Sequence, residues 1–200
     1  MVVMFASIIQ KFVRKRSELV ANRVIPFLEK SNTIIDIGSG TGDVDIVLQS
    51  SGFNITPVDV ADFHGVRLLK TTLYDGKTLP FADRTFDTAL LLMVMHHTPD
   101  PEIILAEASR VANTLVVIET SFITPLGKLL TVILDAIGNL RLEAFWSSYK
   151  TDSEWRDIFS KHGFIVSSSH RYQDKVLGFP FLHISYQLKQ ALSADPKLSR

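Results

Sequence analysis

A glycine-rich turn between a buried strand and a helix constrains this chain more than any other feature of its sequence. The run D-I-G-S-G-T-G occupies Asp36–Gly42; it overlaps the end of the apolar run Thr33–Ile37 and precedes the apolar-rich segment Val44–Leu48. Residues without a β-carbon permit a tight turn and let a ligand approach the backbone, and the helix N-terminus supplies amide donors. Glycines also make purely structural turns, so the prediction of a nucleotide-like ligand needs support from the residues that follow.

Short apolar runs alternate with helical patterns along the whole chain. Seven runs are expected to be strands: Thr33–Ile37, Ile55–Val58, Leu68–Leu73, Phe86–Met95, Thr114–Glu119, Phe164–Ser168 and Phe181–Leu188. Asp100 with Pro101, and Thr151 with Glu154, have the spacing of helix N-caps. This alternation predicts an α/β fold with a mainly parallel sheet covered by helices on both faces.

The glycine spacing separates two classes of ligand. A dinucleotide fingerprint, G-x-G-x-x-G, needs glycine at position 43, where this chain has Asp43. The spacing therefore disfavours NAD or FAD, and an oxidoreductase with them. An acidic side chain beside the turn repels a pyrophosphate and attracts a cationic amino acid or sulfonium.

Two carboxylates follow the next expected strands. Asp59 comes about twenty residues after the glycines, where a carboxylate can accept hydrogen bonds from both hydroxyls of a ribose. The alternative role for Asp59 is to cap a turn or a helix. Asp75 is the analogous candidate for an adenine amino group, and its alternative is an Asp-Gly turn with Gly76.

Composition narrows the partners and the chemistry. The 21 basic and 21 acidic residues balance, so nucleic acid is not expected as a partner. The chain has no cysteine, which excludes disulfides, thiolate metal sites and a cysteine nucleophile. We expect no metal, and we expect the protein to be cytoplasmic. The first residues form an amphipathic helix with basic flanks, which can pack over the domain or, as the alternative, lie on an anionic membrane.

No repeat or long linker divides the chain. We therefore expect a single domain over residues 1–200. Within it, residues 1–30 form an N-terminal helical cap, residues 31–120 the cofactor-binding half, and residues 121–200 a lid helix with closing strands.

The chain resembles the class I S-adenosylmethionine-dependent methyltransferases, especially the small-molecule group. The resemblance rests on D-x-G-x-G-x-G followed by Asp75–Asp87, which reads D-G-K-T-L-P-F-A-D-R-T-F-D, and by Met95–Thr98 with Asp100 and Pro101. It is close over Ile34–Val117. It implies a Rossmann-like sheet of seven strands, the last antiparallel, with the cofactor across the carboxyl ends of the first strands.

The resemblance also implies roles for particular residues. The glycines would surround the methionine part of S-adenosylmethionine, Asp36 would organise its amino group, Asp59 would hold the ribose, and Asp75 with Gly76 would meet adenine. S-Adenosylhomocysteine would be the product. The full expected cofactor set is Asp36, Gly38, Ser39, Gly40, Thr41, Gly42, Asp59, Val60, Asp75, Gly76 and Met93.

Two departures from the family pattern are visible. Residues 60–74 are too few for the helix usual between the second and third strands, which leaves the register around Asp75 less certain. Ala112 and Asn113 replace the usual Lys-Pro-Gly-Gly turn.

Methyl transfer from a sulfonium is a direct displacement that mainly requires alignment and exclusion of water. His96 or His97 is a candidate general base if the acceptor is a hydroxyl or an acidic carbon, and the alternative for each is a structural role. Tyr149, Asp135 and His183 are weaker candidates. The acceptor pocket is expected from the N-terminal helix, the helix over 123–139 and Phe145–Trp146.

The apolar character of these acceptor segments suggests a hydrophobic small molecule, lipid-like or aromatic, although core packing also explains it. The motifs of adenine, glutamine and pyrimidine methyltransferases are absent. A different class remains open, in which a non-catalytic relative uses the same fold to bind the cofactor or a partner protein.

Overall fold

A seven-stranded sheet organises the molecule in the computed structural model, in the order β3-β2-β1-β4-β5-β7-β6. The structure describes residues 2–30, 32–63, 69–139, 146–176 and 179–191, without the side chains of residues 2–12, 134–139, 175–176 and 179–180. The strands are β1 (Thr33–Ile37), β2 (Asn54–Asp59), β3 (Thr72–Leu73), β4 (Phe86–Leu92), β5 (Ala112–Ser121), β6 (Phe164–Val176) and β7 (Phe179–Gln190).

The expected fold class is confirmed. Strands β1 to β5 pair in parallel, whereas β7 lies between β5 and β6 and is antiparallel to both. Ile34 pairs with both Ile55 and Thr88, so β1 lies between β2 and β4 in the middle of the parallel strands. The turn after β1 therefore lies at the point where the strand order reverses. In open α/β sheets, ligands bind at such a point, beyond the carboxyl ends of the strands.

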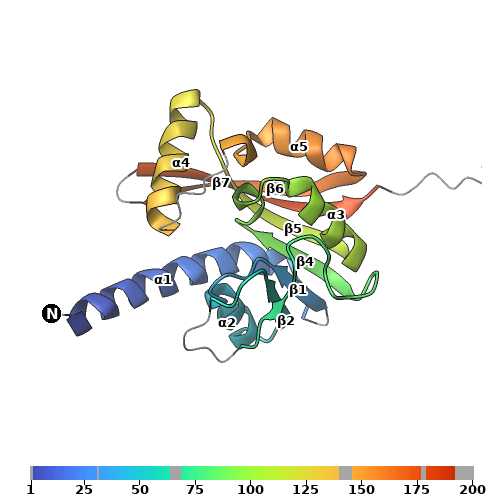
Figure 1. The fold of residues 1–200 in the computed structure, drawn as a ribbon, viewed down its shortest axis with the longest axis horizontal. Coiled ribbons are helices and arrows are strands. Elements are labelled where there is room, and N and C mark those ends of the chain that lie inside the picture. The colour runs from blue at the N-terminus through green and yellow to red at the C-terminus, as the bar shows by residue number, and fades with distance from the viewer. Residues whose placement is uncertain (1, 31, 64–68, 140–145, 177–178, 192–200) are drawn as a thin grey trace, which may run out of the picture.

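Helices cover both faces of this sheet (Figure 1). On one face lie α1 (Val2–Val24) and α2 (Asp43–Ser50); on the other lie α3 (Pro101–Val111) and α5 (Asp152–Lys161). Successive residues of a strand point to opposite faces of the sheet, so the sheet has a hydrophobic core on each face. Ile34 and Leu90 pack against α1 and α2, whereas Ile35 and Leu91 pack in the core beneath α3 and α5.

Both expected N-caps are present. The Asp100 side chain accepts a hydrogen bond from the Glu102 amide with Pro101 at the first helical position, and Thr151 with Glu154 forms a reciprocal capping box. These caps fix where α3 and α5 begin.

The remaining helix, α4 (Pro125–Asn139), stands at the end of the sheet beyond which α1 also extends (Figure 1). Short 3-10 turns occupy Ile25–Phe27, Met95–His97 and Trp146–Ser148. Across the part of the chain that the structure describes, no helix combines the length and apolar character needed to cross a membrane.

Several strand boundaries differ from the sequence expectation. β3 has only two residues where Leu68–Leu73 was expected, and β4 ends at Leu92 because Met93 adopts a φ of 58°, which breaks the extended backbone. β6 and β7 extend well past the expected Phe164–Ser168 and Phe181–Leu188. Pairing along the whole hairpin, from Phe164 with Gln190 to Val176 with Phe179, holds the extra residues as strands.

Candidate functional site

The glycine turn joins β1 to α2 in a backbone conformation that favours glycine at three positions. Gly38, Gly40 and Gly42 have φ of 80°, 55° and 63°, in the left-handed region. The amides of Gly38 and Ser39 donate to the carbonyl of Val58 at 2.8 and 3.1 Å. The turn is therefore tied to the end of β2, so that the carboxyl ends of β1 and β2 form one surface.

Two of these glycines differ in what surrounds them. A β-carbon at Gly38 would lie 2.3 Å from Cγ2 of Val94, whereas a β-carbon at Gly40 would meet nothing within 4 Å. Gly38 thus lets the loop after β4 pack against the turn. Gly40 leaves an open backbone surface that a ligand can approach.

The carboxylate of Asp59 sits directly beside that open surface. Its Oδ2 accepts from the Gly40 amide at 2.7 Å, its Oδ1 accepts from the Val60 amide at 2.7 Å, and the residue is 6% exposed. Val60 is largely exposed, and a β-carbon at Gly76 would lie 3.3 Å from Val60 Cγ1. The structure therefore brings Asp59, Val60 and Gly76 together at one side of the turn.

Asp75 lies in an Asp-Gly turn next to this group. Its Oδ1 accepts from the amides of Thr78 and Lys77 at 2.7 and 2.8 Å, and these hydrogen bonds lower its pKa. A purely structural role in this turn explains the hydrogen bonds of Oδ1 but does not involve Oδ2. Among the described residues no hydrogen bond falls on Oδ2, so the carboxylate keeps an acceptor.

Buried polar atoms beneath the turn make an acidic floor. Burial raises the pKa of Asp36 well above its ordinary value, and the carboxyls of Asp45 and Asp59 raise it further. Oδ1 of Asp36 and Oγ of Ser39 are buried and make no hydrogen bond within the described part of the chain. Such atoms need an explanation, and a cationic ligand group above the turn would supply partners for both.

Sequence reasoning missed Asp45. It is fully buried in the first turn of α2, on the face it shares with Leu48 three residues later. That i, i+3 spacing with a buried leucine was the available signal. Thr41, by contrast, is exposed and donates to the Asp43 carboxylate at 2.8 Å.

The two candidate histidines follow β4 and have different surroundings. His96 is 1% exposed, and its Nδ1 lies 2.5 Å from Oε2 of Glu119, which is fully buried. The other oxygen of Glu119 accepts from the Met95 amide at 2.8 Å. His97 is only partly buried, with its ring 4.1 Å from that of His96. Glu119 therefore holds the segment after β4, a role that sequence reasoning missed.

Tyr149 packs against the ring of His96. Its ring centroid is 4.9 Å from that of His96, and the residue is 1% exposed. Tyr149 thus helps to enclose the His96 ring.

α1 reaches the same end of the sheet. Nη2 of Arg16 lies 3.7 Å from the sulfur of Met93, which is the residue expected to line the cofactor. Arg23 donates to both carboxylate oxygens of Asp174 in β6, at 2.7 and 2.6 Å. The N-terminal helix is therefore attached to the closing hairpin and extends over the end of β4.

His183 belongs to this attachment. Its Nδ1 is 3.3 Å from Oγ1 of Thr120, and its Nε2 is 3.5 Å from Oδ2 of Asp174. Burial lowers the pKa of His183 to about 4, so its ring is neutral at pH 7. The structure places His183 under α1; the side chains of Asp135 and Phe145 lie outside the described residues.

A family model described as a methyltransferase domain matches residues 9–169. No curated protein sequence matches the chain.

Similar structures share the fold at low sequence identity. A SAM-dependent methyltransferase from Methanosarcina mazei has 17% identity and a TM-score of 0.64, over 85% of this chain and 97% of its own. The YcgJ protein from Bacillus subtilis has 15% identity and a TM-score of 0.67, over 87% and 99%. The cyclase SpnF, described as a 4+2 cyclase, has 13% identity and a TM-score of 0.66, over 90% and 81%.

Proposed function

The chain belongs to the methyltransferase domain family, and we propose that it transfers a methyl group from S-adenosylmethionine to a small acceptor with a hydrophobic part. One observation carries the choice of cofactor. Among the described residues, the buried Oδ1 of Asp36 and Oγ of Ser39 have no hydrogen-bond partner, and Gly40 in the same turn is open. A ligand with a cationic amino acid end would supply positive charge beside these crowded carboxyl groups, whereas a pyrophosphate would add negative charge.

The residues around the turn suit the parts of that cofactor. Asp36 would bind the ammonium group, Gly38, Gly40 and Gly42 would follow the methionine backbone with Ser39 and Thr41, and Asp59 would accept from the ribose hydroxyls. Asp75 Oδ2, Val60 and Gly76 would contact adenine, and Met93 would line the far side. S-Adenosylmethionine supplies a methyl group already activated by its sulfonium, so the chain's task is alignment and exclusion of water.

We propose that residues 1–200 act as one domain in this reaction. Residues 1–30 cover the acceptor side, where Arg16 reaches Met93, and residues 121–200 supply α4 and the closing hairpin. Residues 31–120 hold the cofactor.

Binding of S-adenosylhomocysteine tests this proposal directly. Calorimetric titration should give saturable binding to the unmodified protein. Asp59→Ala should raise the dissociation constant about 100-fold, because two charge-assisted hydrogen bonds are lost. Gly40→Val should abolish binding, because its side chain would fill the open surface.

Matched variants separate binding from folding. Asp157→Ala removes an exposed carboxylate from α5 and should bind as the unmodified protein does. Asp59→Asn keeps an acceptor for the Gly40 amide but should still lose most of the affinity. Absence of binding by a protein with a cooperative thermal transition would contradict the proposal.

For an acceptor that must lose a proton, His97 is the better candidate base. The Nδ1 of His96 is engaged with Glu119 and its ring is enclosed, whereas His97 is partly exposed beside it. Adding S-adenosylhomocysteine should shift the imidazole resonances of His97 in NMR spectra by more than those of exposed His170. Equal small shifts would remove His97 from the site.

A second candidate function rests on one of the structural neighbours. SpnF shares this fold and is described as a cyclase, so a related chain need not transfer a methyl group. A cofactor-binding or partner-binding role without methyl transfer is therefore the alternative. Cofactor binding without product formation across an acceptor screen would favour it.

A further inference from the structure

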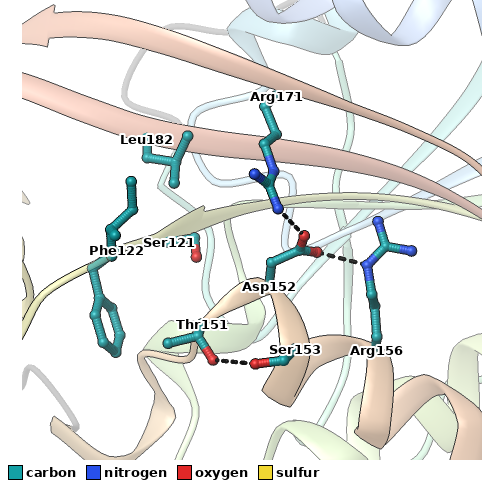
Figure 2. Close-up of a pocket in the computed structure, with 9 residues that line it drawn as sticks. Ser121, Phe122, Thr151, Asp152, Ser153, Arg156, Arg171 and Leu182 are labelled. Atoms are coloured by element: carbon teal, nitrogen blue, oxygen red, sulfur yellow. Dashed lines mark hydrogen bonds and ion pairs between the residues drawn. The ribbon is translucent and has the colours of Figure 1, made fainter.

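A second pocket lies beyond the carboxyl end of β5, apart from the glycine turn (Figure 2). Its volume is about 410 Å³, a size that suits a small molecule. Ser121 and Phe122 form one side, the start of α5 forms another, and Arg171 of β6 with Leu182 of β7 lies along the remaining side. Ser121 follows Glu119 by two residues on β5, so both side chains lie on the same face of that strand.

The charged end of this pocket has an excess of positive charge. Arg156 and Arg171 both bond to the single carboxylate of Asp152, at 2.8 and 2.6 Å (Figure 2). Burial raises the pKa of Asp152, but hydrogen bonds from Arg171, Tyr186 and Arg156 outweigh it and keep the pKa below its ordinary value. Asp152 is therefore ionised at pH 7, and two cations face one anion.

Arg171 has donors available for a ligand. Within the described part of the chain, its Nη2 is the one guanidinium nitrogen that donates a hydrogen bond, to Asp152, and the side chain is 68% exposed. Arg156 is more constrained, because its Nη2 also donates to Ser169 at 2.7 Å. The exposed guanidinium of Arg171 is thus the group available for a carboxylate or phosphate.

Hydroxyl groups lie on the same side of the pocket. The hydroxyls of Thr151 and Ser153 are 3.1 Å apart at the start of α5, and Ser121 donates to the Lys150 carbonyl at 3.2 Å. Thr151 Oγ1 donates to Oε2 of Glu154 at 2.8 Å, so the hydrogen between Thr151 and Ser153 comes from Ser153. The three hydroxyl hydrogens are therefore used within the protein, and Arg171 is the group that can donate to an anionic head.

The opposite end of the pocket is apolar. Phe122, Ile123 and Leu182 line it, and Ile123 is 83% exposed. The apolar surface continues along α4, where Leu126, Leu129, Leu130 and Ile133 recur at helical spacing and are all exposed. A ligand with an anionic head and an apolar body would match both ends.

We propose that this pocket binds the methyl acceptor, and that the acceptor is an amphiphilic acid whose carboxylate or phosphate pairs with Arg171. The inference rests on the proposed function for its reaction. The apolar body of the acceptor packs against Phe122 and Leu182, and the guanidinium of Arg171 contacts the head group. The acceptor then reaches from β5 toward the end of β4.

Short-chain probes test the charge and the apolar part separately. Octanoate should bind the full chain saturably, as followed by NMR titration, whereas octylamine and octan-1-ol should bind at least fivefold more weakly. Arg171→Gln should weaken octanoate binding about tenfold and leave octan-1-ol unchanged, since a charge-assisted hydrogen bond is lost. Lys161→Gln, which removes an exposed cation at the other end of α5, should change neither.

The same preparations are titrated with S-adenosylhomocysteine. Octanoate binding that Arg171→Gln weakens supports the acid site even if S-adenosylhomocysteine does not bind, an outcome that would contradict only the proposed cofactor. Octanoate and octylamine binding equally well, or Arg171→Gln and Lys161→Gln acting alike, would overturn the acid site. Ser153→Ala, which leaves the ion pairs intact, should leave octanoate affinity unchanged, because the Ser153 hydroxyl is engaged with Thr151; a loss as large as that of Arg171→Gln would contradict the assignment of the head group to Arg171.

Discussion

Replacing Glu119 with alanine should lower the free energy of unfolding by about 3–5 kcal/mol, as measured by urea titration. Glu119 is fully buried, and its two oxygens satisfy the Met95 amide and Nδ1 of His96, which is itself 1% exposed. Removing the carboxyl leaves both groups buried without a partner. The cavity left by the side chain adds to the loss.

Glu119→Gln is the matched control. Its amide oxygen can still accept from the Met95 amide, and its NH₂ group can donate to an unprotonated Nδ1 of His96. We expect a loss of about 1–2 kcal/mol, well below that of the alanine variant. Similar losses in the two variants would mean that the charged carboxylate is needed, and that the size and neutral hydrogen bonds kept by glutamine do not replace it.

The Glu119 contacts also predict a functional effect. Segment 93–97 carries Met93 and both candidate histidines, and Glu119 anchors it at Met95 and His96. Glu119 is a positioning residue, because it touches neither the turn nor the proposed ligands. The alanine variant, studied below its thermal transition, should bind S-adenosylhomocysteine more weakly, and the glutamine variant should recover most of that affinity.

Local features were predictable from the sequence. These features depend on residues that are close together in the sequence. They are the glycine turn, the N-caps at Asp100 and Thr151, and the strand-turn-helix order. The mainly parallel sheet followed from alternation of strands and helices, and the antiparallel last strand followed from the family resemblance. The expected cofactor residues Gly40, Asp59 and Gly76 are gathered at one surface because parallel strands end at the same edge.

Long-range side-chain pairs were not predictable in this way. Arg23 and Asp174 are separated by 151 residues, and nothing in either local pattern marks them as partners. Glu119 ended an apolar strand and resembled any polar residue at a strand end. The pocket at Arg171 depends on the length of β6, which extends to Val176 only because β7 pairs along it.

Gly38→Ala should lower the free energy of unfolding by about 2–4 kcal/mol, for two separable reasons. A residue with a β-carbon at a φ of 80° costs about 1 kcal/mol, and the new β-carbon would lie 2.3 Å from Cγ2 of Val94. Gly40→Ala provides the comparison, because its φ of 55° carries the backbone cost but no atom lies within 4 Å. Urea unfolding should place Gly40→Ala about 1 kcal/mol below the unmodified protein.

A second substitution at Val94 isolates the contact. Val94→Ala removes the methyl group at 2.3 Å and leaves the β-carbon at 2.9 Å, so Gly38→Ala should cost at least 1 kcal/mol less in that background. Additive losses would show that backbone strain alone explains the glycine. The two glycine variants should then differ in which measurement changes. Gly38→Ala should act mainly on stability. Gly40→Ala should be nearly as stable as the unmodified chain but should lose affinity for S-adenosylhomocysteine. That division follows from the geometry, in which Gly38 faces Val94 and Gly40 faces the open surface where we propose that the cofactor binds.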